Sequence, residues 1–403
     1  MVLRRILGVP VSLMLALFGV SSITIAQDAT PAAVPGAVVA SGLTNPRGFI
    51  VAADELLYVA LAGSGGSTAA TEDSPAAAIL GPFTGGPTGA VARIESGCPV
   101  AVVTGLPSTL LGSGEVLGAE DVAILNGELY VSTDGGGPSH GNPDAPAGVY
   151  RALADGTFEL IADLSAYLRA NPAAIGTEFP DYDPDADGYR MVADEAAGML
   201  WVLEPNAGGV LSVTPDGFIA RIADLSEGHP VPSAIALAPD GSGVYIGNLT
   251  AVPFPDGAAK VIKVTPDGAV SDVWTGLTTV TGVAVGPDGT LYALEMSTGN
   301  LEEPPFLMPG TGRIVRMTGP DTLEVVAEGL MFPIHLAVAP DGVSFYVSMP
   351  AIGANDGSGM IMQIGMDDAA SPAADTGGTP PACDPIPETL YVPEGTPMAS
   401  PEA

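Results

Sequence analysis

The residues best suited to chemistry are three aspartates at alternate positions, with a glycine after the last: Asp183, Asp185 and Asp187. Carboxylates in the pattern D-x-D-x-D-G open an oxygen-lined loop of the kind that binds Ca²⁺. The twelfth position of such a loop holds Asp194, but an intervening strand would carry it roughly 20 Å away at about 3.3 Å per residue. We therefore predict half of a calcium site, which water or Glu120 and Asp121 would have to complete. A solvated acidic turn without metal is the alternative.

A second set of polar residues lies at the start of six short apolar runs, at positions that a closed ring of strands would bring together. This set contains Arg47, Glu120, Asp121, Tyr189, Arg190, Ser233, Thr281 and His335. Polar side chains gathered at one mouth of a central channel predict a binding site for a small molecule, a carbohydrate or a protein. The alternative is a solvated mouth in which arginine–carboxylate pairs hold neighbouring units together.

Several common catalytic motifs are absent from the chain. It contains no P-loop, no H-E-x-x-H and no Cys/His spacing typical of zinc sites. His140 and His229 stand in stretches typical of loops. We therefore predict a non-catalytic binding or scaffold protein. A metal-dependent hydrolase or lactonase that uses Glu120, Asp121 and the carboxylates of 183–187 is the alternative.

The elements that must position these residues form a repeat. Each unit holds four short runs of apolar and β-branched residues separated by Pro, Asp and Gly, which is typical of strands. P-D-G segments close hairpins, because Pro presets φ and Gly tolerates a positive φ. Leucines 52 to 63 residues apart mark the end of each fourth run: Leu43, Leu106, Leu164, Leu225, Leu277 and Leu330. An aromatic residue recurs in each second run: Tyr58, Tyr130, Trp201, Tyr245, Tyr292 and Tyr346. The repeat predicts an all-β, six-bladed β-propeller of four-stranded antiparallel blades.

The two ends of the repeat complement each other. The last unit has three runs, ending near Met366, and lacks a fourth. Residues 36–43 form a fourth run without the first three. We therefore predict that this N-terminal strand completes the last blade and closes the ring, which removes a free sheet edge.

The remaining segments set the domain boundaries. We predict a signal peptide over 1–26, a flexible leader over 27–35, the propeller over 36–366 and a mostly disordered Pro/Ala/Thr-rich tail over 367–403. Two insertions interrupt the repeat, at 61–87 and 165–188, and the second begins with a short helix for which we predict Ser165 as N-cap.

Charge and the N-terminus bear on location and partners. The formal net charge of −34 opposes binding to nucleic acid and to anionic membrane surfaces. Arg4 and Arg5 precede an apolar run over 6–20, and a small residue, Ala26, ends the segment before Gln27. This pattern predicts a secretory signal and a secreted or periplasmic protein, with no membrane span after cleavage.

The chain has only two cysteines, Cys98 and Cys383. Export would permit them to pair. In a closed ring Cys98 lies in the first blade and Cys383 in the tail that leaves the last blade, so the two are neighbours. We therefore predict a disulfide across the closure, with two independent thiols as the alternative.

Four segments carry a family resemblance: G-L-T-N-P-R-G-F at 42–49, D-L-S-A-Y-L-R-A-N-P at 163–172, the run from Val244 to Val264, and V-W-T-G-L…M-S-T ending at Thr298. They resemble the ScyD/ScyE family of exported propeller proteins. The resemblance covers roughly 36–366 and implies a six-bladed, TolB-like or NHL-like propeller outside the cytoplasm. It implies no catalytic residues. The extra carboxylates of 183–187 depart from the family pattern, so the resemblance does not supply a calcium site.

A second resemblance is to calcium-dependent lactonases and phosphotriesterases of the same propeller shape. Those enzymes place Glu, Asn and Asp ligands at the starts of their inner strands. Glu120 and Asp121 are available here, but no Asn stands at the start of an inner strand. A shared fold alone does not carry an activity over.

Overall fold

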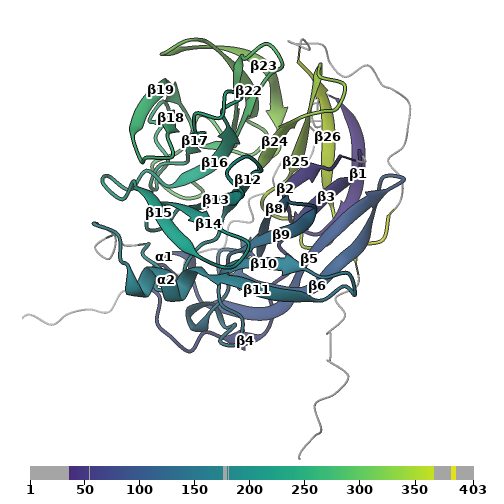
Figure 1. Cartoon of the computed structure of the whole chain (residues 1–403), viewed down its shortest axis with the longest axis vertical. Helices are drawn as coiled ribbons and strands as arrows, with labels where there is room; N and C mark the ends of the chain where they lie inside the picture. The colour runs from purple at the N-terminus through teal and green to yellow at the C-terminus, as the bar shows by residue number, and fades with distance from the viewer. Residues whose placement is uncertain (1–35, 54, 176–178, 180, 367–382, 387–403) are drawn as a thin grey trace, which may run out of the picture. The chain divides into compact units, whose positions relative to one another are not determined.

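Six antiparallel sheets make up the part of the chain that is described. The structure is a computed structural model, and it describes residues 36–53, 55–175, 179, 181–366 and 383–386, all within the unit Ala33–Ala403. The innermost strands of the sheets lie around the centre of the view in Figure 1, with β8, β12, β16 and β24 labelled there. The predicted six-bladed β-propeller is confirmed.

The blades follow one another along the chain. Blade 1 consists of β2 Pro46–Val51, β3 Leu57–Leu61, β5 Phe83–Glu95 and β6 Cys98–Leu111, with the short strands β4 Thr68–Ala69 and β7 Val116–Leu117 beside them. Blade 2 consists of β8 Ala119–Leu125, β9 Glu128–Thr133, β10 Gly148–Ala152 and β11 Phe158–Asp163. Blade 3 consists of β12 Arg190–Asp194, β13 Met199–Glu204, β14 Gly209–Val213 and β15 Ile219–Asp224. Blade 4 consists of β16 Pro232–Leu237, β17 Val244–Asn248, β18 Ala259–Val264 and β19 Val270–Leu277. Blade 5 consists of β20 Val280–Val285, β21 Leu291–Glu295, β22 Gly312–Gly319 and β23 Thr322–Leu330. Blade 6 consists of β24 His335–Val338, β25 Ser344–Met349, β26 Gly359–Gly365 and β1 Ala37–Leu43.

The P-D-G segments form the hairpins that the sequence predicts. In the turn between β16 and β17, Gly241 adopts φ +69° and its N–H donates to the carbonyl of Ala238 at 2.9 Å. The carboxylate of Asp240 accepts a hydrogen bond from the N–H of Ser242 at 3.0 Å. Glycine is required because a side chain at this φ is strained, and the aspartate stabilises the turn from within.

The hydrophobic core is divided among the blade boundaries. Between blades 2 and 3, Tyr130 and Val149 pack against Leu200 and Leu211, all of them nearly fully buried. Equivalent clusters join blades 1 and 2, 3 and 4, 4 and 5, 5 and 6, and 6 and 1. Each sheet buries its faces against its neighbours, so the ring is held together by the hydrophobic effect at every boundary.

The two ends of the propeller meet in blade 6. Strand β1 pairs antiparallel with β26, with Ala37 opposite Gln363 and Val38 opposite Met362. The inner strands contact their neighbours in turn, and β24 contacts β2. The predicted closure by the N-terminal strand is therefore confirmed.

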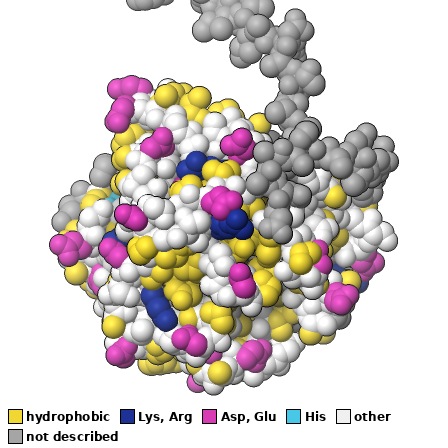
Figure 2. Space-filling model, turned by 90° about the horizontal axis from the view of Figure 1, so that it is seen from above, with side chains coloured by type: hydrophobic (Ala, Val, Ile, Leu, Met, Phe, Trp, Pro, Cys, Tyr) yellow, Lys and Arg dark blue, Asp and Glu magenta, His cyan; other side chains and the backbone are white. Residues whose placement is uncertain are grey.

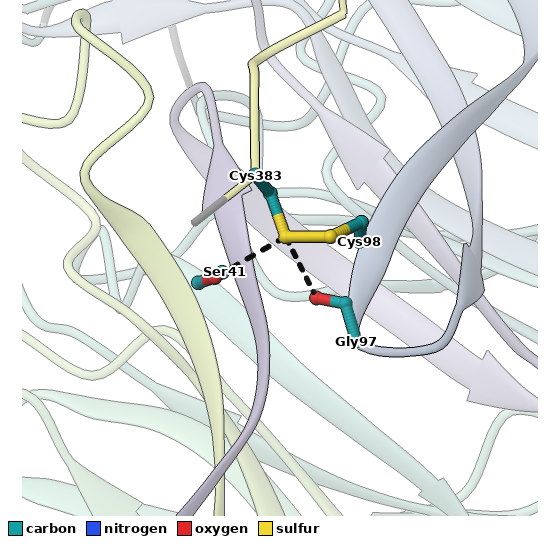
Figure 3. Close-up of a disulfide and its surroundings, with 4 residues drawn as sticks. All are labelled: Ser41, Gly97, Cys98 and Cys383. Atoms are coloured by element: carbon teal, nitrogen blue, oxygen red, sulfur yellow. Dashed lines mark hydrogen bonds between the residues drawn. A yellow bond between two sulfur atoms is a disulfide. The ribbon is translucent and has the colours of Figure 1, made fainter. Parts of the chain in front are cut away.

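A disulfide between Cys98 and Cys383 crosses this closure, as the sequence predicts. Figure 3 shows it beside β1, where the hydroxyl of Ser41 donates to the Cys383 sulfur at 3.5 Å. Gly42 adopts φ +75°, and a Cβ there would lie 2.8 Å from the Cβ of Cys383. The segment that carries Cys383 therefore lies directly against the closing strand.

The described ranges contain few helices, and these are short: α1 Ala77–Leu80, α2 Leu164–Ala170 and the 3₁₀ turn η1 Pro138–His140. The prediction of Ser165 as N-cap of α2 is wrong, because the Asp163 carboxylate caps the helix by accepting from the N–H of Ala166 at 2.7 Å. Ser165 Oγ instead accepts from the N–H of Ala186 at 3.0 Å. Among the residues described, no helix has the length and apolar character that crossing a bilayer requires. The predicted signal peptide, the leader and most of the predicted tail lie outside the described residues.

Candidate functional site

The predicted channel-mouth residues lie at the upper face, which we define as the face where each inner strand begins and each second strand ends. Arg47 stands in β2, Glu120 and Asp121 in β8, Tyr189 just before β12, Arg190 at the start of β12, Ser233 in β16, Thr281 in β20 and His335 at the start of β24. Six of them are almost fully buried: Arg47, Glu120, Asp121, Arg190, Ser233 and Thr281.

Two arginines and one glutamate close the upper end of the channel. Arg47 Nε lies 3.1 Å from Glu120 Oε2, and its Nη1 donates to the carbonyl of Ala351 at 2.7 Å. Arg190 donates to the carbonyls of Glu120 and Ile334, both at 2.8 Å. Burial raises the pKa of Glu120, against the opposing effect of Arg47. These side chains bind to blades 2 and 6 rather than to solvent.

The other members of the set also join neighbouring blades. Two hydroxyls of the set donate to a backbone carbonyl of the next blade or of the loop leading into it: Ser233 to Val280 at 2.6 Å and Thr281 to Pro333 at 2.9 Å. Ser348, which is outside the set, donates in the same way to the carbonyl of Arg47 at 2.7 Å. The Arg190 guanidinium stacks on the Tyr189 ring, 4.5 Å from its centroid. The arginine–carboxylate pairing of the alternative interpretation is present, but it is buried rather than solvated. A ligand at these residues stays a prediction.

Below this closure the channel is an apolar cavity of about 360 Å³. Residues of all six inner strands line it, such as Val51, Val192 and Leu237, with Asp121 and His335 as its polar members. Burial raises the pKa of Asp121 to about 7, against the effects of Arg190 and two backbone N–H donors. Burial, and then the charge of Arg190, lowers the pKa of His335 to about 3.

The irregular segments of the chain converge away from the channel, between blades 2 and 3. The insertion of blade 1 reaches this point, where the N–H of Thr71 donates to the carbonyl of Pro138 at 2.9 Å. Ser74 Oγ of the same insertion donates to Asp183 Oδ2 at 2.8 Å. The two insertions and the long loop of blade 2 therefore build one site on a regular scaffold, which is where propellers and other scaffolds tend to carry function.

Two of the three predicted calcium ligands already have protein partners. Ser139 Oγ lies 2.8 Å from Asp183 Oδ1 and 2.6 Å from Asp185 Oδ2. Arg169 Nη2 lies 2.6 Å from Asp185 Oδ1. A Cβ at Gly137 would lie 2.3 Å from the Asp185 carboxylate, so this loop requires glycine at that position. Both oxygens of Asp185 are thus engaged by the protein.

The third, Asp187, lies in a different group. Asp134, His140 and Asp187 each offer one ligand atom, and these atoms lie within 4.8 Å of one another. We call these residues the His–Asp trio. Burial, and then the charge of Asp134, raises the pKa of Asp187 well above its usual range. Burial, and then the charge of Glu120, does the same to Asp134. His140 also forms a second group of this kind with Asp183 and Asp185. Glu120 and Asp121 lie at the channel and belong to neither group among the described residues.

A cavity of about 160 Å³ opens beside the trio, and we call it the blade 2–3 pocket. Its polar wall is formed by Arg169, Tyr182, Asp183, Asp185 and Glu204, and its apolar wall by Leu168, Pro172, Ala173, Ala174, Pro184 and Ala207. Glu204 Oε2 accepts from the N–H of Ala207 at 2.8 Å, and burial raises the pKa of Glu204 to about 7. The pocket therefore combines carboxylate acceptors with one guanidinium donor.

Sequence reasoning missed Asp134, His140 and Glu204. Asp134 follows β9 directly and Glu204 ends β13, so both stand at the same face as 183–187. The sequence could have indicated Asp134 and Glu204, because each is a carboxylate at the end of a blade's second strand. No local pattern in the sequence indicates His140 as a site residue, because its burial depends on Phe83 of the neighbouring blade. The two rings stack with their centroids 5.3 Å apart.

Comparison with known proteins shows the fold and nothing narrower. No protein-family model matches the chain, and no curated protein matches it. A solved structure from Thermus thermophilus, described as an oxidoreductase (glucose dehydrogenase), is 14% identical with a TM-score of 0.53, covering 82% of this chain and 99% of that one. The PQQ-bound aldose sugar dehydrogenase from Streptomyces coelicolor is 13% identical with a TM-score of 0.50, covering 83% of this chain and 99% of its own. A structure described as a gluconolactonase is 12% identical with a TM-score of 0.45, covering 83% and 93%. These neighbours share a propeller architecture with this chain.

Proposed function

We propose that this protein is an exported binding module that holds a small, uncharged, hydroxyl-rich molecule of the carbohydrate class in the blade 2–3 pocket. The observation that supports this is the polar wall of the pocket, where Asp183, Asp185 and Glu204 face Arg169. Carboxylates accept hydrogen bonds from hydroxyl groups, and guanidinium groups donate to them. The volume of 160 Å³ lies below the roughly 300–1,000 Å³ of pockets for drug-sized ligands, which suits a single sugar ring.

Charge favours an uncharged ligand over an anionic one. Three carboxylates line the pocket, and the single guanidinium is already paired with Asp185. Acidic side chains are spread over the face seen in Figure 2, with few Lys or Arg among them. The net charge of −34 adds a repulsive field for anions.

Calorimetric titration of the purified protein with neutral hexoses and with the matching uronic acids tests the proposal. We expect a neutral sugar to bind and Arg169→Leu to weaken it by at least about tenfold, the size of one charge-assisted hydrogen bond. Arg316→Leu is the matched control, because Arg316 forms a similar exposed ion pair with Glu324 in blade 5. Binding of uronic acids alone, or no binding by the unaltered protein, would reject this ligand class.

A metal-dependent hydrolase is the second candidate. Glu204 favours it, because this carboxylate lines the pocket and its Oε1 also accepts from the N–H of Asp187 in the His–Asp trio at 3.3 Å. A carboxylate beside a bound metal can position a water for attack. Lactone and phosphoester substrates should be turned over by the unaltered protein, while Glu204→Gln should still bind them and turn over none. If no divalent metal supports turnover, the hydrolase is rejected and the binding module is retained.

Export and membership of the ScyD/ScyE family are part of the same proposal. The N-terminal signal pattern and the Cys98–Cys383 disulfide support export, since disulfides persist in oxidising compartments. The six blades closed by β1 are compatible with the quoted family motifs. Fractionation of the native host, probed with an antibody, should find the chain outside the cytoplasm and shortened at its N-terminus.

A further inference from the structure

We propose that the His–Asp trio of Asp134, His140 and Asp187 binds one divalent cation of the first transition series, such as Mn²⁺ or Zn²⁺. The site lies in the wall between blades 2 and 3, behind the blade 2–3 pocket. It concerns atoms other than those assigned to the sugar ligand, so either assignment can fail alone.

The geometry suits a single ion. Asp134 follows β9, His140 ends η1, and Asp187 precedes β12, so three separate segments each deliver one ligand. The ligand atoms all lie within 4.8 Å of one another. Ion–ligand distances of about 2.0–2.2 Å place two ligands of one ion about 3 to 4.4 Å apart, so the three ligand atoms would have to draw slightly together around an ion.

His140 points to a ligand independently of the carboxylates. It is 1% exposed, and its Nδ1 lies 3.1 Å from the carbonyl of Gly136. We assign the ring proton to Nδ1, because a carbonyl can only accept. Nε2 then presents a lone pair, and its nearest carboxylate oxygen, Asp183 Oδ2, lies 3.6 Å away. A buried lone pair aimed at carboxylates requires a positive partner, and a backbone carbonyl that fixes the other nitrogen is the usual arrangement of a metal-bound histidine.

The two aspartates require the same partner. The carboxyl groups of Asp134 and Asp187 are hydrogen-bonded to each other, and Asp134 also accepts from the N–H of Gly135. The one nearby guanidinium, Arg169, is paired with Asp185 instead. Asp134 is buried and Asp187 partly buried, and two carboxylates in contact repel each other unless a cation or a shared proton lies between them.

The kind of cation follows from the donor set. Ca²⁺ takes six to eight oxygen ligands, and the trio offers one nitrogen with two carboxylates. Imidazole and carboxylate together suit Mn²⁺, Fe²⁺ and Zn²⁺. The D-x-D-x-D-G segment does not form a calcium loop of its own, since Asp185 is held by Ser139 and Arg169.

The test uses the purified full chain, stripped with chelator and dialysed against Mn²⁺, Zn²⁺, Ca²⁺ or Mg²⁺ in turn. We expect about one Mn²⁺ or Zn²⁺ per chain by elemental analysis and a higher Tm with either ion. His140→Gln should weaken the affinity by at least about tenfold, since even partners behind the ligands have effects of that size. His229→Gln is the matched control: His229 is also buried at the upper face, but it pairs with Asp181 at 3.0 Å.

Asp187→Asn separates a metal site from a merely structural cluster. Without metal this variant should melt at a higher temperature than the unaltered chain, because the Asn amide can donate to Asp134 where two carboxylates must repel each other or share one proton. With Mn²⁺ or Zn²⁺ the Tm of the variant should not rise further, whereas that of the unaltered chain should. With either metal the unaltered chain should therefore have the higher Tm. A variant that is less stable in chelator, a Tm rise that survives His140→Gln, or a response to Ca²⁺ alone would each overturn the proposal.

Discussion

Asp121 and His335 show how burial acts in opposite senses on two residues that line one cavity. The Asp121 carboxylate accepts from the N–H groups of Val122 and Met191, both at 2.9 Å, and its pKa is still raised to about 7. The native state therefore binds more protons than the unfolded chain between pH 3.8 and about 7, and this contribution falls as pH rises. His335, with its pKa lowered to about 3, binds fewer protons than the unfolded chain up to pH 6.5, and its contribution rises with pH.

A pair of variants should reveal these opposite slopes. The free energy of unfolding of the unaltered chain minus that of Asp121→Asn should fall from pH 4 to 7. The same difference for His335→Gln should rise from pH 3 to 6.5. Each slope is at most on the order of 1.4 kcal/mol per pH unit. Urea unfolding with chelator present measures both, and slopes of equal sign would show that the assigned burial effects are wrong.

The sequence predicts where single residues lie in the fold, but not which groups they contact. The strand repeat placed Arg47, Glu120 and Arg190 at one end of the channel, and the structure has them there. It did not predict that Arg190 donates to the carbonyl of Ile334, because that contact joins segments 144 residues apart. The sequence predicts a loop residue at His140 and not its burial, because another blade buries this side chain.

At the scale of elements, β1 and the disulfide act on the same boundary. Strand β1 supplies the outer strand of blade 6, and Cys98 begins β6 of blade 1. Cys383 lies against Gly42 of β1, so one covalent bond joins the tail, the closing strand and the first blade. Strand pairing, an apolar cluster and a disulfide therefore all stabilise the boundary between blades 6 and 1.

Replacing Cys98 with serine should lower stability by about 2–5 kcal/mol, the range for loss of a native disulfide that closes a long loop. The double variant with Cys383→Ser should match the single one, since the bond is already lost. Ser41→Ala is the control, because it removes a neighbouring hydroxyl and keeps the bond. Chemical denaturation with and without reductant measures the difference; an unaltered chain that reductant does not destabilise would mean that the bond adds nothing.

Elements were the most predictable feature of the chain. Local turn chemistry fixes the P-D-G hairpins, and the period of the repeat fixes the number of blades. The cap of α2 was misplaced by two residues, because Asp163 competes with Ser165 and its carboxylate is the stronger acceptor. Local rules could not predict the blade 2–3 pocket, since α2, the segment around Asp183 and the end of β13 meet only in the folded chain to form it.

For the whole molecule, the dominant feature is charge. Twelve Lys and Arg stand against 46 Asp and Glu, and the acidic side chains are distributed over the face in Figure 2. Like charges repel across a compact molecule, and salt screens this repulsion over about 10 Å at 0.1 M.

We therefore expect the Tm to rise between about 10 mM and 500 mM NaCl, a range over which screening becomes strong. KCl should have the same effect as NaCl, since screening does not depend on the identity of the ion. Chelator keeps the His–Asp trio from contributing. A Tm that falls with salt would show that surface ion pairs, such as Arg151 with Glu128, outweigh the net repulsion.

The Cys98–Cys383 bond also changes what happens when the backbone is cut. The two cysteines are 285 positions apart in the sequence, and the segment between them contains all of blades 2 to 5, so most hairpins of the propeller lie inside one covalent loop. A protease that cleaves any one of these hairpins leaves two fragments joined by sulfur and by the surrounding sheets. A molecule cut once in this way would therefore remain a single particle.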